Sequence, residues 1–349
     1  MRRLLASLLL LAGLAGPVLA QSELPAEAPT PETSPAVEPA SPEPASDQSG
    51  TVAPATVDPN RFGGGTVDPS RFGEKVLDPA YGAFQRGLYR TALNLALPRA
   101  KNGDPNAQTL VAEILSRGLG IKRDEKEAAN WYRLAAEQGV PEAQFQYALL
   151  LLDGRFVARD EQGAHALLEA AAEAGNALAQ FNFAQILAKR SSGQSGLGRA
   201  VTYYQRAAEQ GLADAQYAMS QVLASGVGDL KPDPVKAREW LEKAARQNYD
   251  TAQLDLGTWL VLGRGGAKDE KTGFSWLQRA AAGGNIAAQN RLAKLFVAGL
   301  GTEPDVVTGA AWYILARRGG LRDAEMDDVM NGLTAEETKQ ALERANRLR

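Results

Sequence analysis

The sequence predicts an all-α fold, an αα solenoid of about six helix-turn-helix repeats of 36 residues. The first observation is the dipeptide Ala-Gln, which begins at residues 107, 143, 179, 215, 252 and 288 and so recurs every 36 or 37 residues. A second marker keeps the same period, a pair of aromatic or leucine residues at Trp131-Tyr132, Leu167-Leu168, Tyr203-Tyr204, Trp240-Leu241, Trp276-Leu277 and Trp312-Tyr313. Repeats of roughly 20–50 residues are typical of solenoids, in which each unit buries its apolar face against its neighbours.

The unit 140–175 contains the signals of two helices and the turn between them. Pro141 suits the first turn of a helix, strong helix formers follow, and Gly154 ends the segment. Asp160 is placed to cap a second helix, which Gly175 ends in the left-handed conformation. We call the first helix of each unit helix A and the second helix B.

The same signals recur in step across the six units. The capping position of helix B is occupied by Asp124, Asp160, Gly196, Asp233, Asp269 and Asp305. The residue that ends helix B is Gly139, Gly175, Gly211, Asn248, Gly284 or Gly320. The third turn, 191–198, has lost its capping Asp and is rich in Ser and Gly, so we expect it to be mobile. The longer fourth unit has its extra residue in the turn 227–232.

The register divides the array into units 104–139, 140–175, 176–211, 212–248, 249–284 and 285–320. Before them, 80–102 is predicted as one opening helix of type B. After them, 321–330 and 334–348 are predicted as two closing helices. Thr334 and Glu337 have the spacing of a capping box, and the last helix has the charged outer face that a terminal unit requires.

Two segments precede the array, which is expected to span 80–349. Residues 1–20 have the pattern of a cleaved signal peptide: Arg2 and Arg3, an apolar run and a small-residue cleavage site. Residues 21–79 are rich in Pro, Ala and Glu, and they are predicted to be a disordered acidic linker. The chain has no cysteine, which together with the signal peptide favours export to a bacterial periplasm, with secretion or the cell surface left open.

The linker ends in tandem Asp-Pro-x-Arg-Phe-Gly motifs at 58–63 and 68–73, with a weaker echo at 78–82. The Arg and aromatic pair would suit docking in a groove, and tandem copies would raise its local concentration. The alternative is a duplication that a tolerant linker retained. The duplication is the favoured interpretation, because short tracts diverge freely where no core restrains them.

The repeats resemble the Sel-one-like repeat family, which is related to tetratricopeptide repeats. The likeness is carried by AANWYRLAAEQGVPEAQFQYALLLLDG (128–154) and AVTYYQRAAEQGLADAQYAMSQVLASGVG (200–228), and it extends from about residue 83 to 349. The resemblance implies a right-handed αα superhelix that acts as an adaptor or binder of other proteins, often in export compartments or at the cell surface. A disulfide-bonded branch of this family is not implied, because the chain lacks cysteine.

Comparing the six units separates positions that serve stacking from positions free for recognition. The fourth residue of each unit is always Ala and the twelfth is Leu or Phe, as expected for core positions at helical spacing. The third, seventh and tenth residues vary, and their spacing places them on one face of helix A, with the sixth residue beside them. We call this surface the helix-A face. In unit order the sixth residues are Thr109, Phe145, Phe181, Tyr217, Leu254 and Asn290. The seventh are Leu110, Gln146, Asn182, Ala218, Asp255 and Arg291, and the tenth are Glu113, Leu149, Gln185, Gln221, Thr258 and Lys294.

We expect this face to line a concave groove that takes an extended or helical peptide. The candidate partner-binding residues are Phe145, Gln146, Leu149, Phe181, Asn182, Gln185, Tyr217, Gln221, Asp255 and Thr258. For the three aromatics the alternative is packing between units. The amides are harder to place in a core.

The sequence carries no recognisable catalytic or metal-binding pattern. His165 is the single histidine, and its position has no fixed residue type in the other units. The segment 263–268 lacks the Gly-Lys-Ser/Thr ending of a phosphate loop and falls where every repeat turns. We therefore expect a non-enzymatic scaffold without cofactor, metal or nucleic acid, which binds a protein or peptide. The alternatives are a regulator that restrains a membrane sensor kinase and a peptidoglycan-associated binder or cell-wall enzyme.

Overall fold

The structure is a computed structural model, and it describes residues 78–190, 194–228 and 230–348. The predicted signal peptide, nearly all of the predicted linker and the first two tandem motifs lie outside these residues. Within them, the helices are α2 (Pro79–Gln85), α3 (Tyr89–Lys101), α4 (Pro105–Arg117), α5 (Glu125–Glu137), α6 (Pro141–Asp153), α7 (Glu161–Glu173), α8 (Ala177–Arg190), α9 (Gln194–Glu209), α10 (Ala213–Ser225), α11 (Pro234–Arg246), α12 (Asp250–Leu262), α13 (Glu270–Ala282), α14 (Ile286–Ala298), α15 (Val306–Arg318), α16 (Ala324–Asn331) and α17 (Ala335–Arg347).

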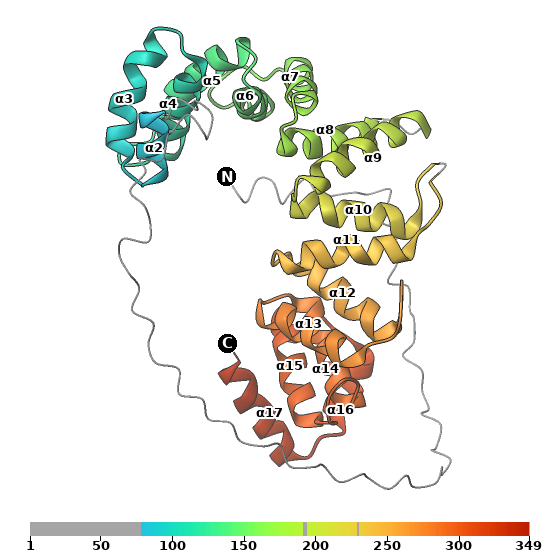
Figure 1. The fold of residues 1–349 in the computed structure, drawn as a ribbon. Coiled ribbons are helices and arrows are strands. Elements are labelled where there is room, and N and C mark those ends of the chain that lie inside the picture. The colour runs from blue at the N-terminus through green and yellow to red at the C-terminus, as the bar shows by residue number, and fades with distance from the viewer. Residues whose placement is uncertain (1–77, 191–193, 229, 349) are drawn as a thin grey trace, which may run out of the picture. The chain divides into compact units, whose positions relative to one another are not determined.

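The described helices form the predicted αα solenoid. From α2 to α15, each helix packs extensively against the next one in the chain. Helix α17 packs against α15, and the short helix α16 makes a smaller contact with α15 (Figure 1). Helices α4, α6, α8, α10, α12 and α14 are the six A helices, and α5, α7, α9, α11, α13 and α15 are the six B helices. The described part of the chain contains no helix that is long and apolar enough to cross a membrane.

The helix boundaries follow the predicted signals. The B helices are capped by aspartates, each of which accepts the backbone N–H of the third helical residue: Asp124, Asp160, Asp233, Asp269 and Asp305. All six residues predicted to end helix B have positive φ, including Asn248 at 64°. After Gly139, the N–H of Val140 returns to the carbonyl of Ala135 at 3.2 Å, which closes the helix.

The Ala-Gln marker has a structural explanation that the sequence pattern alone did not provide. In every unit the Gln side chain donates to the carbonyl of an Ala eight residues earlier, near the end of the preceding helix, over 3.1–3.5 Å. Three of these glutamines, Gln108, Gln180 and Gln216, accept a further bond of 2.8 Å from the glutamine near the end of their own unit's helix B. Each of these carbonyls also accepts the backbone N–H three residues later in the chain. The Gln side chain is therefore a second donor, and it links helix A to the end of the preceding helix.

Small residues bring helix A close to helix B, and larger ones fill the core between units. Ala148 of α6 and Ala164 of α7 are fully buried, and in unit five Gly257 and Gly273 occupy the equivalent positions. A Cβ added at Gly273 would lie 2.7 Å from the carbonyl oxygen of Gly257, so these two helices approach too closely for alanine. The second residue of each aromatic or leucine pair is buried, as Leu168 is at 0 % exposed.

Two predicted helix boundaries differ from the structure. The opening segment 80–102 is not one helix, because Gly87 adopts φ 77° and the N–H of Leu88 bonds to the carbonyl of Ala83, ending α2. In the third turn, α9 already begins at Gln194, so Gly196 lies inside the helix rather than at its cap. Residues 191–193 of the turn predicted to be mobile lie outside the described residues.

The C-terminal end is an incomplete seventh unit. Ala324-Glu325 in α16 stands 36 residues after the Ala-Gln of α14. Helix α17 follows it but packs against α15 rather than α16, so it does not take the place of helix B. Helix α16 starts at the fourth position of this unit, two residues later in register than the A helices α6 and α14. The predicted capping box is confirmed, since Thr334 and Glu337 exchange hydrogen bonds at the start of α17.

Candidate functional site

Nine of the ten candidate partner-binding residues are half-buried on the A helices. The tenth, Phe145, is 3 % exposed and belongs to the apolar core around α6 and α7. Its assignment to a binding surface was wrong, because its aromatic ring is covered by neighbouring helices. Leu149 packs against the same core from its edge.

The other two aromatic candidates make close contacts within the array. The ring of Phe181 lies 5.7 Å from that of Tyr204, on helix B of the same unit. Tyr217 stacks on Tyr249, at the start of the next unit, with ring centroids 5.1 Å apart and planes 30° apart. Both rings also pack against the apolar core, which supports the packing alternative for them.

The amides of units two and three have no partner in the next unit's helix A. Gln146 donates to the Glu142 carboxylate at 2.9 Å, one turn earlier in α6. Asn182 donates to the carbonyl of Leu178 at 2.7 Å, one turn earlier in α8. No described residue hydrogen-bonds the side chain of Gln185. These amides keep donor and acceptor capacity toward solvent.

Tyr204, on helix B of unit three, carries a second unmatched polar group. Its hydroxyl is buried and has no hydrogen-bond partner. In unit one the equivalent tyrosine, Tyr132, donates to Glu113 at 2.8 Å, and Glu113 occupies the position that Gln185 has in unit three. Burial raises the pKa of Tyr204 above its usual range, so its hydroxyl stays protonated.

In units four and five the helix-A face is joined across the unit boundary. The Asp255 carboxylate of α12 accepts from the hydroxyl of Tyr217 at 2.9 Å and from the amide of Gln221 at 3.3 Å, both on α10. Thr258 instead bonds to the carbonyl of Leu254 in its own helix. Burial raises the pKa of Asp255, whereas the Tyr217 hydroxyl and nearby arginines favour its charged form.

Two arginines near Asp255 were not among the candidates. Arg264 follows α12 in the loop 263–268, where its guanidinium lies 4.2 Å from the centroid of the Trp259 ring. Arg291 is the seventh residue of unit six, on α14. Both arginines act electrostatically on the Asp255 carboxylate. Sequence comparison gave Arg291 as a variable position, but only the structure brings these three charges together.

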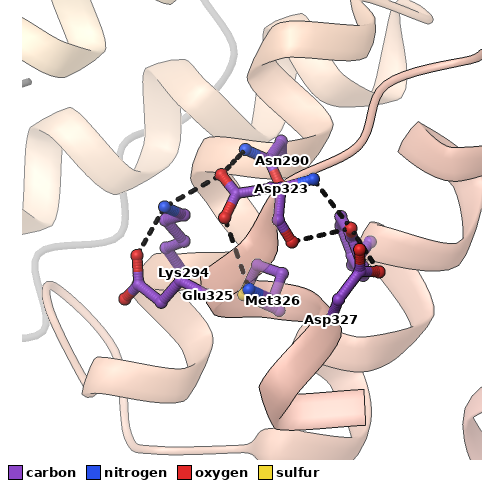
Figure 2. A network of polar contacts seen from close by, with 7 residues as sticks. Asn290, Lys294, Asp323, Glu325, Met326 and Asp327 are labelled. Carbon is purple, nitrogen blue, oxygen red and sulfur yellow. Dashed lines mark hydrogen bonds and ion pairs between the residues drawn. The ribbon is translucent and has the colours of Figure 1, made fainter. Parts of the chain in front are cut away.

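The helix-A face of unit six is sealed by α16 (Figure 2). Asn290 donates to the Asp323 carboxylate at 2.8 Å, and the Lys294 ammonium pairs with Asp323 at 2.9 Å and with Glu325 at 2.6 Å. Asp323 also accepts the N–H of Met326 at 3.3 Å and so caps α16. The sixth and tenth positions thus bond to the following unit, as in unit four.

The remaining sequence candidates for chemistry agree with a structural role. In the loop 263–268, Gly263 and Gly265 have positive φ, and a Cβ on Gly265 would collide with the carbonyl of Pro234, which explains the glycine. Burial lowers the pKa of the His165 imidazole, and its Nδ1 has no hydrogen-bond partner. Among the described residues, no three His, Asp or Glu side chains are placed to hold a metal ion.

Comparison with known proteins identifies the repeats. The Sel1 repeat model matches residues 105–140, 141–176, 179–212, 213–249, 251–285 and 286–321. No curated protein matches the chain. A Sel1 repeat protein from Oxalobacter formigenes is similar at 25 % identity and TM-score 0.59, over 70 % of this chain and 98 % of that one. A protective antigen of uropathogenic Escherichia coli with an SLR fold is similar at 26 % identity and TM-score 0.50, over 74 % of this chain.

The present chain spans 63 % of the length of that antigen, so the likeness concerns the repeat array rather than the whole of it. The matched segments coincide with the helix pairs within a few residues and run without a long gap from α4 to α15. With six consecutive matches over most of its described residues, the chain belongs to the Sel1 repeat family.

Proposed function

We propose that the chain is an exported, non-enzymatic adaptor that binds a partner protein or peptide on its helix-A face. Sel1 repeats generally mediate protein–protein interactions. The observation that carries the proposal is the state of units two and three, where Gln146 and Asn182 bond only within their own helices and Gln185 has no partner. A peptide backbone has the complementary donors and acceptors.

The first test changes these three amides in the mature chain. The triple variant Gln146→Arg, Asn182→Arg, Gln185→Arg adds bulk and charge to the face without cutting into the core. Its matched control is Gln162→Arg, Gln205→Arg, Gln278→Arg, which makes the same changes at exposed positions of three B helices. Helical melts by circular dichroism check that both variants remain folded.

Crosslinking and affinity capture from the cell envelope then compare the two variants with the unchanged chain. A protein recovered by the unchanged chain and by the control, but lost with the face variant, would support the proposed surface and name the partner. Equal recovery by all three would rule out the helix-A face of units two and three as the binding surface.

Export is the second part of the proposal, and it rests on the signal-peptide pattern of residues 1–20. Cleavage before Gln21 would remove Arg2 and Arg3 and leave 36 basic and 41 acidic residues, a net charge of −5. Intact mass spectrometry of the protein from fractionated cells tests this directly. A chain that retains Met1 and remains with the cytoplasmic fraction would contradict export.

A further inference from the structure

Arg291 is a half-buried cation without a bonded partner. It lies on α14, and no described residue makes an ion pair or hydrogen bond with its guanidinium. Lys294, one turn later on the same helix, pairs with both Asp323 and Glu325 (Figure 2). The two cations share one helix face, yet only the second is matched by the array itself.

The carboxylate that acts electrostatically on Arg291 already accepts two hydrogen bonds. Asp255 accepts from Tyr217 and from Gln221, and it forms no ion pair with Arg291. Burial lowers the pKa of Arg291, an effect that the charge of Asp255 only partly opposes. Burying a guanidinium without pairing it with an anion costs free energy. The position of Arg291 therefore favours binding of an anion that the array does not supply.

The local charge balance indicates which anion fits. Arg264, the other arginine that acts on Asp255, stacks on the Trp259 ring and donates to the carbonyl of Ala224 at 3.5 Å. Two guanidinium groups and one carboxylate leave a single positive charge. One carboxylate neutralises that charge, whereas a phosphate dianion would leave a net negative charge beside Asp255.

We infer that Arg291, together with Arg264, which acts on the same Asp255, forms a binding site for a carboxylate of an acidic peptide. The inference rests on the proposed function, and it extends the binding surface from units two and three to units five and six. A guanidinium can hold a carboxylate through two parallel hydrogen bonds, so an acidic side chain or a C-terminal carboxylate would be oriented as well as attracted.

The test titrates the mature chain with defined probes and follows the arginine Nε–Hε signals by NMR. The Arg291 signal is assigned by its loss in Arg291→Lys. Acetyl-Ala-Glu-Glu-Ala-amide carries only side-chain carboxylates, acetyl-Ala-Gln-Gln-Ala only a C-terminal one, and acetyl-Ala-Gln-Gln-Ala-amide none. Inorganic phosphate is the fourth probe.

We expect a saturable shift of the Arg291 signal with at least one carboxylate probe, weakened by salt, and none with the uncharged peptide. Which of the two responds identifies the source of the carboxylate. No shift with either would overturn the inference, as would a response to phosphate alone. Equal shifts at Arg133, a half-buried arginine paired with Glu137 on α5, would also overturn it, because they would indicate non-specific attraction.

Anisotropy of the responding peptide, labelled with a fluorophore, measures the contribution of Arg291. Arg291→Gln should weaken binding by about tenfold or more, since it removes a charge-assisted hydrogen-bonding group. Arg291→Lys should recover only part of the loss, because an ammonium lacks the paired donors. Arg133→Gln is the matched control and should leave the affinity unchanged. If Arg291→Gln also leaves it unchanged, the site is wrong.

These outcomes are independent of the capture experiment. If the face variant loses its partner but no carboxylate probe reaches Arg291, the proposed function stands and this site falls. If the probes bind while the face variant keeps its partner, the carboxylate site stands and the binding surface assigned to units two and three falls.

Discussion

Units two and three differ from units four and six in where the polar side chains of the helix-A face find their hydrogen-bond partners. In the earlier pair, Gln146 and Asn182 bond within their own helices. In the later units, Tyr217 and Gln221 reach Asp255 of the next unit, and Asn290 and Lys294 reach Asp323 of the incomplete seventh. The helix-A face thus carries amides without a partner in the next unit in one region, and bonds between units in the other.

The largest expected effect tests whether the two regions share one fold. Leu168→Ala in unit two and Leu277→Ala in unit five each empty a position that is 0 % or 1 % exposed. Each change should cost about 2–5 kcal/mol of unfolding free energy, measured in urea. Leu262→Ala removes the same atoms from a side chain 41 % exposed and should cost much less.

Hydrogen exchange measured along the chain shows which units unfold locally in each of the two core variants. Solenoid units are stabilised by themselves and by their nearest neighbours, so each core variant should raise hydrogen exchange most in its own and adjacent units. Equal increases from α4 to α15 in both variants would mean that the array unfolds as one unit, and the regional distinction would then have no consequence for stability.

A smaller effect is expected where α16 seals unit six. Asp323→Ala removes the helix cap, the bond from Asn290 and one of the two partners of Lys294. It should cost about 1–3 kcal/mol and increase hydrogen exchange in α16. Asp269→Ala removes a cap from α13 without a described ion pair to another unit, and should cost less. Equal losses would mean that the bonds from α14 to Asp323 add nothing to stability.

Register accounts for what the sequence predicted well. Helix ends are local events, so the residues at 139, 175, 211, 248, 284 and 320 indicated positive φ before any packing was considered. The glycine at 87 carries the same signal and shows why one opening helix was wrong. The partners of the helix-A face were not predictable in this way, because the bond from Gln221 to Asp255 depends on how two units stack.

The candidate site was accordingly predicted less well than the fold. The position of Phe145 varies between units as a recognition position would, but Phe145 is buried. Different side chains fill the equivalent space in neighbouring units, so variation at this position is compatible with a core role. Arg264 belongs to a loop that the sequence explained by its glycines, and its place near Asp255 depends on the fold. Variation between copies shows freedom from one constraint, not exposure to solvent.

Next in size is a comparison of two tyrosines. Tyr132→Phe removes a hydroxyl that donates to Glu113 at 2.8 Å, and should cost about 1 kcal/mol. Tyr204→Phe removes a buried hydroxyl without a partner, and should be neutral or stabilise the protein by up to about 1 kcal/mol. Thermal melts of both variants measure the difference. A loss from Tyr204→Phe as large as that from Tyr132→Phe would show that the hydroxyl is bonded in solution.

The smallest effects are expected in the pH dependence, where two aspartates should act with opposite sign. The backbone N–H of Thr272 holds the pKa of Asp269 below its ordinary value, and burial holds the pKa of Asp255 above it. Asp269 therefore contributes stability above the ordinary aspartate pKa of about 3.9 that is lost as the pH falls. Asp255 contributes stability that is present below that pKa and is lost as the pH rises.

Urea unfolding of Asp269→Asn and Asp255→Asn from neutral pH to about pH 3 separates the two signs. The advantage of the unchanged chain over Asp269→Asn should shrink on acidification, whereas its stability relative to Asp255→Asn should improve. Asparagine keeps a hydrogen-bond acceptor at both sites, so the pH-dependent part of each difference reports the charge. The opposite result would be a loss of stability of the unchanged chain relative to Asp255→Asn on acidification. In that case, the attraction of Arg291 and Arg264 for the Asp255 carboxylate would outweigh the effect of burial on its pKa. The array itself would then supply the anion for Arg291, and units five and six would be closed to a partner.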